Sequence, residues 1–171
     1  MEELDQQRIL ALDVRPRTFA FVVFEDSRQL LDWGARSFRG GVNAVRVPLG
    51  PKVTRLLDEY APEVLALKYP QTETLKKIIQ VIRKQAMVHK IPVRVVSPKV
   101  LQETFIGHNR NKHQIASAIA ERFPELLYIL PPKRKPWQSE DYRTSIFDAG
   151  ALGVAYFASQ RSRGVPVIPT S

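Results

Sequence analysis

The sequence predicts an α/β protein whose mixed central sheet has three antiparallel strands followed by two parallel strands and is flanked by helices. Three runs of strand length near the start are rich in β-branched and aromatic residues and are separated by polar turns, which is typical of an antiparallel meander. Two shorter runs further along are dominated by Val, Leu and Ala, as is typical of buried parallel strands. Helical periodicity lies between and after these two runs.

The antiparallel strands are expected at residues 9–12, 18–24 and 30–38. The segments between them, Asp-Val-Arg-Pro-Arg and Glu-Asp-Ser-Arg, are rich in turn-forming residues, and a Gly-Gly pair after residue 39 ends the pattern. The three strands should therefore pair as consecutive neighbours.

Helices and strands alternate in the middle of the chain. A helix is expected over residues 52–60, just after a proline, and a fully buried strand at 64–67. A long amphipathic helix over residues 72–89 leads to a second buried strand at 93–96. That helix is expected to turn one set of side chains inward, Leu75, Ile78, Ile79, Ile82 and Met87, and another outward, Lys76, Lys77, Arg83 and Lys84.

Three further helices complete the prediction. Ser97 and Pro98 form an N-cap followed by a proline at the first helical position. A Gly/Asn turn opens a helix over residues 112–122, and the last helix is expected over residues 139–156. The proline-rich basic stretch between them, residues 129–137, is expected to be an exposed loop.

Length and composition limit the class of protein. A chain of 171 residues with 44% hydrophobic composition can bury the core of one domain, expected over residues 1–160, with a flexible tail over 161–171. The absence of cysteine excludes disulfides and thiolate sites. The polar, acidic start lacks the pattern expected of a signal peptide, and no apolar run approaches the roughly 20 residues that cross a bilayer. We expect a cytoplasmic protein with no membrane association.

Positive charge is concentrated in one part of the chain. The formal net charge is +9, and the segment from Lys68 to Lys112 contains ten Lys or Arg but only two Glu. Regional basicity of this kind indicates a surface for a polyanion such as DNA, although a solvated helix face gives the same pattern. The residues expected to bind nucleic acid are Lys76, Lys77, Arg83, Lys84, Arg110, Lys112, Lys133, Arg134 and Lys135.

Two acids stand at positions where a carboxylate is costly. Asp13 follows a buried strand, and Asp148 shares a helix face with Ala151, Leu152 and Ala155. A buried carboxylate needs a cationic partner, and a metal ion is one such partner. Asp13 before Arg-Pro-Arg is also a good turn former, so the segment alone leaves both interpretations open.

The residues at these positions together resemble the RuvC family of Holliday junction resolvases, which has a ribonuclease H-like fold. The resemblance rests on Asp13, on the strand end at Leu67-Lys68, on the turn at residues 107–112 and on the run Asp148-Ala-Gly-Ala-Leu. It implies a dimeric, Mg²⁺- or Mn²⁺-dependent endonuclease that cuts branched DNA, with four carboxylates holding two metal ions. Carried over, Asp13 and Asp148 are catalytic metal ligands, and Lys112 lies near the scissile phosphate.

The other two acid positions depart from the family pattern. Lys68 stands where the second acid is expected, and Ser145 stands where the third is expected. Glu140 and Asp141 are candidate replacement acids about two turns before Asp148, and Asp141 is preferred because a separation of seven residues would put it on the helix face of Asp148. The alternative is that both acids serve the N-terminus of that helix. A buried structural pair of Asp13 or Asp148 with Lys68 is equally compatible with the sequence.

Two functions therefore remain open. One is metal-dependent cleavage of branched DNA through Asp13 and Asp148. The other is a pseudonuclease without a cofactor, which binds nucleic acid or a protein partner. The loop residues Lys133, Arg134, Lys135 and Trp137 combine cations with an indole, which can follow a phosphate backbone and stack on a base. A Trp137 side chain folded back on the domain is the alternative.

Overall fold

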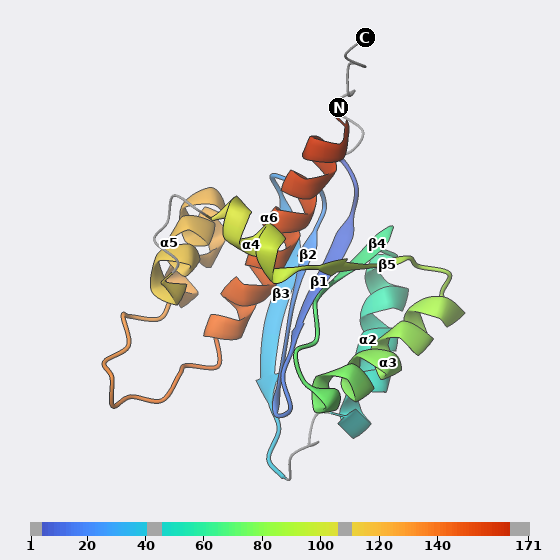
Figure 1. The fold of residues 1–171 in the computed structure, drawn as a ribbon, viewed down its shortest axis with the longest axis horizontal. Helices are drawn as coiled ribbons and strands as arrows, with labels where there is room; N and C mark the ends of the chain where they lie inside the picture. The colour runs from blue at the N-terminus through green and yellow to red at the C-terminus, as the bar shows by residue number, and fades with distance from the viewer. Residues whose placement is uncertain (1–4, 41–45, 106–110, 165–171) are drawn as a thin grey trace.

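A computed structural model describes residues 5–40, 46–105 and 111–164, and its centre is a five-stranded mixed sheet (Figure 1). The strands are β1 (Ile9–Val14), β2 (Thr18–Phe24), β3 (Leu30–Ser37), β4 (Val64–Lys68) and β5 (Val93–Val96). Their order in the sheet is β3-β2-β1-β4-β5, with β1, β2 and β3 antiparallel and β4 and β5 parallel to β1. The predicted mixed sheet is therefore confirmed.

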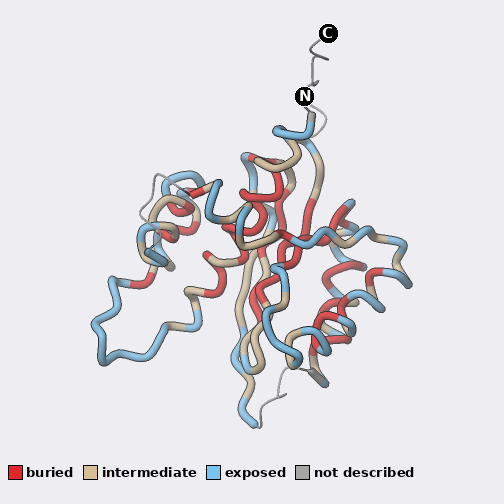
Figure 2. The backbone as a smooth tube through the Cα atoms, in the orientation of Figure 1, coloured by how far each residue is buried: buried red, intermediate tan, exposed pale blue. Residues whose placement is uncertain are grey.

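Helices cover both faces of the sheet (Figure 1). The helices α2 (Arg46–Tyr60) and α3 (Glu73–Val88) pack on one face. The other face carries α4 (Pro98–Thr104), α5 (Lys112–Arg122), the 3-10 helix η2 (Pro124–Ile129) and the long α6 (Thr144–Gly164). Figure 2 shows the buried backbone concentrated in the sheet and on the helix faces that meet it.

Alternation along β1 decides which side each of its residues faces. Leu10 and Leu12 belong to the core under α2 and α3, whereas Ile9 and Ala11 belong to the core under α6. Because successive side chains of a strand point to opposite faces, Asp13 continues the row of Ile9 and Ala11 and faces α6. The sequence pattern of β1 thus directs its one carboxylate toward the helix that carries Asp148.

Close packing fixes α6 on the sheet. A Cβ atom on Gly153 would lie 2.1 Å from the ring of Phe24, so this glycine allows the helix to approach β2. The Phe24 ring also makes edge contacts with the rings of Phe123 and Phe157. The position of Asp148, one and a half turns earlier on the same helix, follows from this packing.

The structure corrects several of the predicted elements. Helix α2 begins at Arg46 rather than at residue 52 and includes Pro51. Met87, predicted to face inward, is 76% exposed, because the buried stripe of α3 continues from Ile82 to Ala86. Strand β5 was predicted to be buried, but as the edge strand it exposes Arg94 and Val95.

Both ends of α6 also differ from the prediction. The helix begins at Thr144 instead of residue 139, because Asp141 forms a turn in which its carboxylate accepts the backbone N–H of Arg143 at 2.9 Å. It continues through residues 161–164, which were assigned to a flexible tail, and Arg161 there donates to the Asp5 carboxylate at 2.9 Å. Within the described residues, no helix combines the length and the apolar character that crossing a membrane requires.

Candidate functional site

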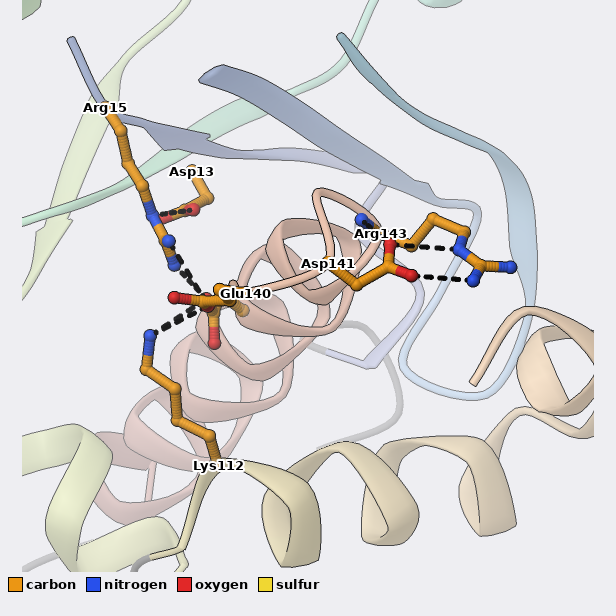
Figure 3. A network of polar contacts seen from close by, with 7 residues as sticks. Asp13, Arg15, Lys112, Glu140, Asp141 and Arg143 are labelled. Carbon is orange, nitrogen blue, oxygen red and sulfur yellow. Dashed lines mark hydrogen bonds and ion pairs between the residues drawn. The ribbon is translucent and has the colours of Figure 1, made fainter. Parts of the chain in front are cut away.

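Asp13 on β1 and Asp148 on α6 contact the same guanidinium, that of Arg15. Figure 3 shows Arg15 beside Asp13. Arg15 Nε lies 3.3 Å from Asp13 Oδ2, and Arg15 Nη2 donates to Asp148 Oδ2. Arg15 Nη1 donates to Glu140 Oε1 at 3.3 Å. One arginine therefore contacts three carboxylates, which come from β1, from α6 and from the segment before α6.

The hairpin between β1 and β2 places Arg15 in this position. Arg15 directly follows β1, and its backbone N–H donates to the carbonyl of Thr18 at 2.9 Å, which closes a tight turn. Since side chains two residues apart on an extended chain share a face, Arg15 lies on the same side as Asp13. The Arg-Pro-Arg motif thus supplies both the turn and the cation.

Lys112 adds a second cation from the start of α5. Asn111 caps this helix by accepting the N–H of His113 at 2.8 Å, so Lys112 occupies the first helical position. Lys112 Nζ donates to Glu140 Oε1 at 3.1 Å and lies 4.0 Å from Asp148 Oδ2. Glu140 therefore bridges Arg15 and Lys112, as the left half of Figure 3 shows.

Burial dominates the electrostatics of the two aspartates. Desolvation, followed by repulsion from Asp148, raises the pKa of Asp13 to about 6, although Arg15, Lys68 and Lys112 pull it down. Burial also raises the pKa of Asp148 above its usual range, against the attraction of Lys112 and Arg15. Desolvation lowers the pKa of the Arg15 guanidinium, but the charges of the three carboxylates outweigh it and raise that pKa.

The pKa of Glu140 is shifted in the opposite direction from those of the two aspartates. Burial raises its pKa, but the hydrogen bond from Lys112 and the charge of Arg15 outweigh burial and hold the pKa below its usual range. Glu140 is therefore the carboxylate of this cluster that is most firmly ionised. We call Asp13, Arg15, Lys112, Glu140 and Asp148 the Arg15 cluster.

The donor set of the Arg15 cluster does not fit a pair of divalent cations. Among the described residues, no group of three or more Asp, Glu or His side chains is arranged to hold a metal ion. Lys68, exposed at the end of β4, and Ser145, buried in the first turn of α6, stand where two further acids would be needed. The buried Asp13 Oδ2 accepts no hydrogen bond from the residues that the structure describes, and among them Arg15 compensates it by charge.

The ion pair that the sequence suggested for Lys68 is corrected by the structure. The sequence suggested that Lys68 pairs with Asp13 or Asp148, but in the described part of the chain the cations that contact these carboxylates are Arg15 and Lys112. Lys68 acts at longer range, where its charge lowers the pKa values of both aspartates. A long lysine at the strand end keeps its ammonium in water, whereas the guanidinium of Arg15 is folded back by the hairpin.

Asp141 does not share the helix face of Asp148, because it precedes α6. Its carboxylate is held by Arg143, with Asp141 Oδ2 2.7 Å from Arg143 Nη2, and this bond lowers the pKa of Asp141. Figure 3 shows this pair to one side of the Arg15 cluster. Its neighbour Glu140 is the acid that contacts the Arg15 cluster. The sequence favoured Asp141 because the helix was expected to begin at residue 139.

The basic residues predicted to bind nucleic acid fall in two places. Lys76, Lys77, Arg83 and Lys84 are exposed on α3, on the sheet face away from α6, and Lys76 pairs with Glu73 at 3.0 Å. Lys133, Arg134 and Lys135 are exposed on the loop that precedes α6, on the side of Lys112. Arg110 lies outside the described residues.

Three clefts surround the Arg15 cluster. Asp13, Arg15, Lys68 and Lys112 line two of them, of about 240 and 270 Å³, one on each side of the strand ends. A larger cleft of about 610 Å³ lies between the start of α5 and the loop before α6, with Lys112 and Glu140 in its wall. Open clefts edged with cations are suited to phosphate groups rather than to apolar ligands.

A mixed sheet of this order with α6 across it and two aspartates at the β1–α6 junction defines the ribonuclease H-like class of fold. Within that class the structure is similar to those of Holliday junction resolvases. Neither a family model nor a curated protein matches the chain.

Three solved structures illustrate the similarity. The T. thermophilus RuvC structure in complex with a Holliday junction substrate superposes with a TM-score of 0.66 at 15% identity, covering 91% of this chain and 96% of that one. The yeast mitochondrial Holliday junction resolvase gives a TM-score of 0.64 at 12% identity, covering 93% and 82%. The fowlpox virus resolvase, in complex with its substrate Holliday junction DNA, gives 0.53 at 17% identity, covering 90% and 98%. The chain therefore has the RuvC-like ribonuclease H fold.

Proposed function

We propose that this protein binds branched DNA and that its Arg15 cluster is neutralised internally instead of by divalent cations. The fold supports the first half, since two of the similar structures are resolvases in complex with Holliday junction DNA. The second half goes beyond the fold, because function is decided at the site.

The observation that carries the proposal is the contact of one guanidinium with three carboxylates. A guanidinium keeps its charge at any physiological pH and donates in a fixed, planar geometry. With Lys112 beside it, the two cations supply the positive charge that Asp13, Glu140 and Asp148 require. A metal ion would have to displace both cations and would find too few remaining ligands.

DNA binding in this proposal depends on exposed cations. Lys112 is 59% exposed at the N-terminus of α5, where the helix dipole also favours an anion, and a phosphate there would compete with Glu140 for its ammonium. The exposed Lys133, Arg134 and Lys135 lie on the same side of the sheet. Together they form a path for a DNA backbone that passes over the Arg15 cluster.

The test compares a four-way junction with a linear duplex of the same base composition, in EDTA and in Mg²⁺ or Mn²⁺. We expect the junction to bind more tightly than the duplex, with an affinity that falls steeply with salt and is no higher in divalent cations than in EDTA. We expect no strand to be cut. Equal affinity for junction and duplex would contradict the proposed function.

Cleavage would establish the alternative function, a metal-dependent resolvase. If Mg²⁺ or Mn²⁺ supports cutting of the junction, and Asp13→Asn abolishes it while binding persists, the aspartates act as metal ligands. The matched control is Asp141→Asn, which removes a neighbouring carboxylate whose partner is Arg143.

Homodimerisation, which the resemblance implies, is part of the same proposal. A four-way junction has two-fold symmetry, and a symmetric dimer presents the same surface to two of its arms. Light scattering of the free protein and of its junction complex tests this, with two protein chains per junction as the expected result.

A further inference from the structure

The loop before α6 carries a tryptophan on a well-defined turn. The backbone N–H of Gln138 donates to the carbonyl of Lys135 at 3.0 Å, which closes a four-residue turn with Pro136 and Trp137 at its tip. The side chain of Gln138 accepts the N–H of Lys135, also at 3.0 Å. Pro136 fixes one backbone angle at the second position of the turn, so two hydrogen bonds and a ring hold the tip in one shape.

The indole at this tip faces water. Trp137 is 78% exposed, which decides against a side chain folded back on the domain. The turn projects away from the sheet and the helices in Figure 1 and is exposed along its length in Figure 2. A large aromatic ring held in solvent on a fixed turn is open to a ligand that stacks on it.

The charges around the indole indicate what that ligand is. Lys135 Nζ lies 5.5 Å from the centre of the Trp137 ring, and Lys133 and Arg134 are exposed next to it. None of these three cations forms an ion pair with any residue that the structure describes. An aromatic ring among free cations matches a strand of nucleic acid, whose bases stack and whose phosphates carry the negative charge.

The cleft behind the turn has room for part of such a strand. Lys133, Arg134 and Gln138 form one wall of the 610 Å³ cleft, and Lys112 and His113 at the start of α5 form the opposite wall. That volume lies within the range of about 300–1,000 Å³ typical of small-ligand sites. The cleft also leads to the Arg15 cluster through Lys112 and Glu140.

We propose that the turn at residues 135–138 binds unpaired DNA, with Trp137 stacking on an exposed base and Lys133, Arg134 and Lys135 holding the flanking phosphates. This inference rests on the proposed function, because unpaired or distorted bases occur where DNA branches. It adds a specific ligand, the unpaired base, to a surface otherwise assigned to phosphates.

The experiment uses the fluorescence of the full chain. The sequence has two tryptophans, and Trp33 on β3 is only partly exposed, so the difference between the natural chain and Trp137→Phe isolates the signal of Trp137. Titration with a short oligothymidylate should quench that signal. Inorganic polyphosphate, a polyanion without bases, should leave it unchanged at concentrations that saturate binding.

Affinity measurements provide the second readout. Trp137→Ala should weaken oligothymidylate binding by about 5- to 150-fold, the range found for loss of one stacked base. Tyr128→Ala is the matched control, because Tyr128 is 76% exposed on η2 and lies outside the turn. Since both side chains are exposed, both variants should fold, which the far-ultraviolet circular dichroism spectrum verifies.

The outcomes separate this inference from the proposed function. Equal quenching by polyphosphate, or unchanged oligothymidylate affinity in Trp137→Ala, overturns the role of the turn even if the four-way junction still binds. Quenching and loss of affinity for oligothymidylate support the turn even if the junction is bound no better than duplex. In that case only the proposed preference for branched DNA fails.

Discussion

Arg15 and the cations of the loop before α6 carry the same charge in opposite surroundings. Arg15 is 32% exposed and contacts three carboxylates, whereas Lys133, Arg134 and Lys135 are exposed and form no ion pair within the described residues. The charge of Arg15 is balanced by carboxylates inside the protein, whereas the charges of the loop cations are open to a ligand.

The difference separates a cluster whose charges balance inside the protein from an exposed basic surface, which the proposed function assigns to DNA. Carboxylates at the end of a buried strand remain costly whatever the protein does, so a resident cation stabilises them. Cations on a loop have no such structural role, and their effect on stability is small. Substitutions in the two regions should therefore affect different measurements.

The largest effect is expected from Arg15→Ala. The substitution leaves Asp13, Asp148 and Glu140 without their shared cation, and we expect it to lower the free energy of unfolding by about 2–4 kcal/mol at neutral pH. Urea denaturation measures the change. Lys133 is a loop cation without a carboxylate partner in the described structure, so the free energy of unfolding of Lys133→Ala should lie within about 0.5 kcal/mol of that of the natural chain. An equal loss of stability in both variants would contradict the difference between the two regions.

Asp13→Asn should have an effect of opposite sign. The pKa of Asp13 is raised to about 6 in the folded protein from the ordinary 3.8, so the folded state binds this proton more tightly than the unfolded chain does. The stability that the proton contributes is present below pH 3.8 and is lost as the pH rises through about 6.

The asparagine variant avoids that loss. At pH 7.5 it should be more stable than the natural chain by on the order of 2 kcal/mol, and near pH 4 the gain should vanish. Glu73→Gln, which alters an acid 82% exposed on α3, serves as control and should show no such pH dependence. Lower stability of Asp13→Asn at both pH values would show that the Arg15 contact outweighs burial.

Glu140→Gln should make Lys112 resemble the unpaired cations of the loop, with a smaller effect on stability than Arg15→Ala. It releases Lys112 from its 3.1 Å bond and costs under about 1 kcal/mol of stability, because the pair is partly exposed. The freed ammonium should tighten junction binding and steepen its salt dependence by up to about 0.9 in the log–log slope. Asp141→Asn is the matched control, and unchanged binding in Glu140→Gln would mean that Lys112 does not meet DNA.

The sequence predicted the sheet well because its signals there are local. The apolar, β-branched and aromatic residues of β1 and β2, the caps at Thr72, Ser97 and Asn111, and the apolar run of β4 specify the elements without tertiary information. Asp13 and Asp148 were singled out because each stands beside apolar residues in the sequence, and their role as metal ligands stays a prediction. The burial of edge strand β5 was predicted wrongly, because burial depends on the elements that cover a strand and these cannot be inferred from its own residues.

The contacts of the site were harder to predict. Arg15 follows Asp13 by two residues, a spacing that puts both on one face, but its role depends on a hairpin that returns the side chain toward α6. The choice between Glu140 and Asp141 depends on the residue at which α6 begins, and helix starts are uncertain by a few residues in any sequence. The exposure of Trp137 likewise depends on a turn closed by Gln138.

The central claim, that Arg15 and Lys112 take the place of divalent cations, is tested most directly by the melting temperature in Mn²⁺. A ligand that binds only the folded state raises the melting temperature, and the rise grows with the logarithm of the ligand concentration above its dissociation constant. We predict the same melting temperature in EDTA and in millimolar Mn²⁺ for the natural chain. A rise in Mn²⁺ that Asp13→Asn abolishes and Asp141→Asn preserves would contradict the claim, because it would place a metal ion on the carboxylates that Arg15 contacts.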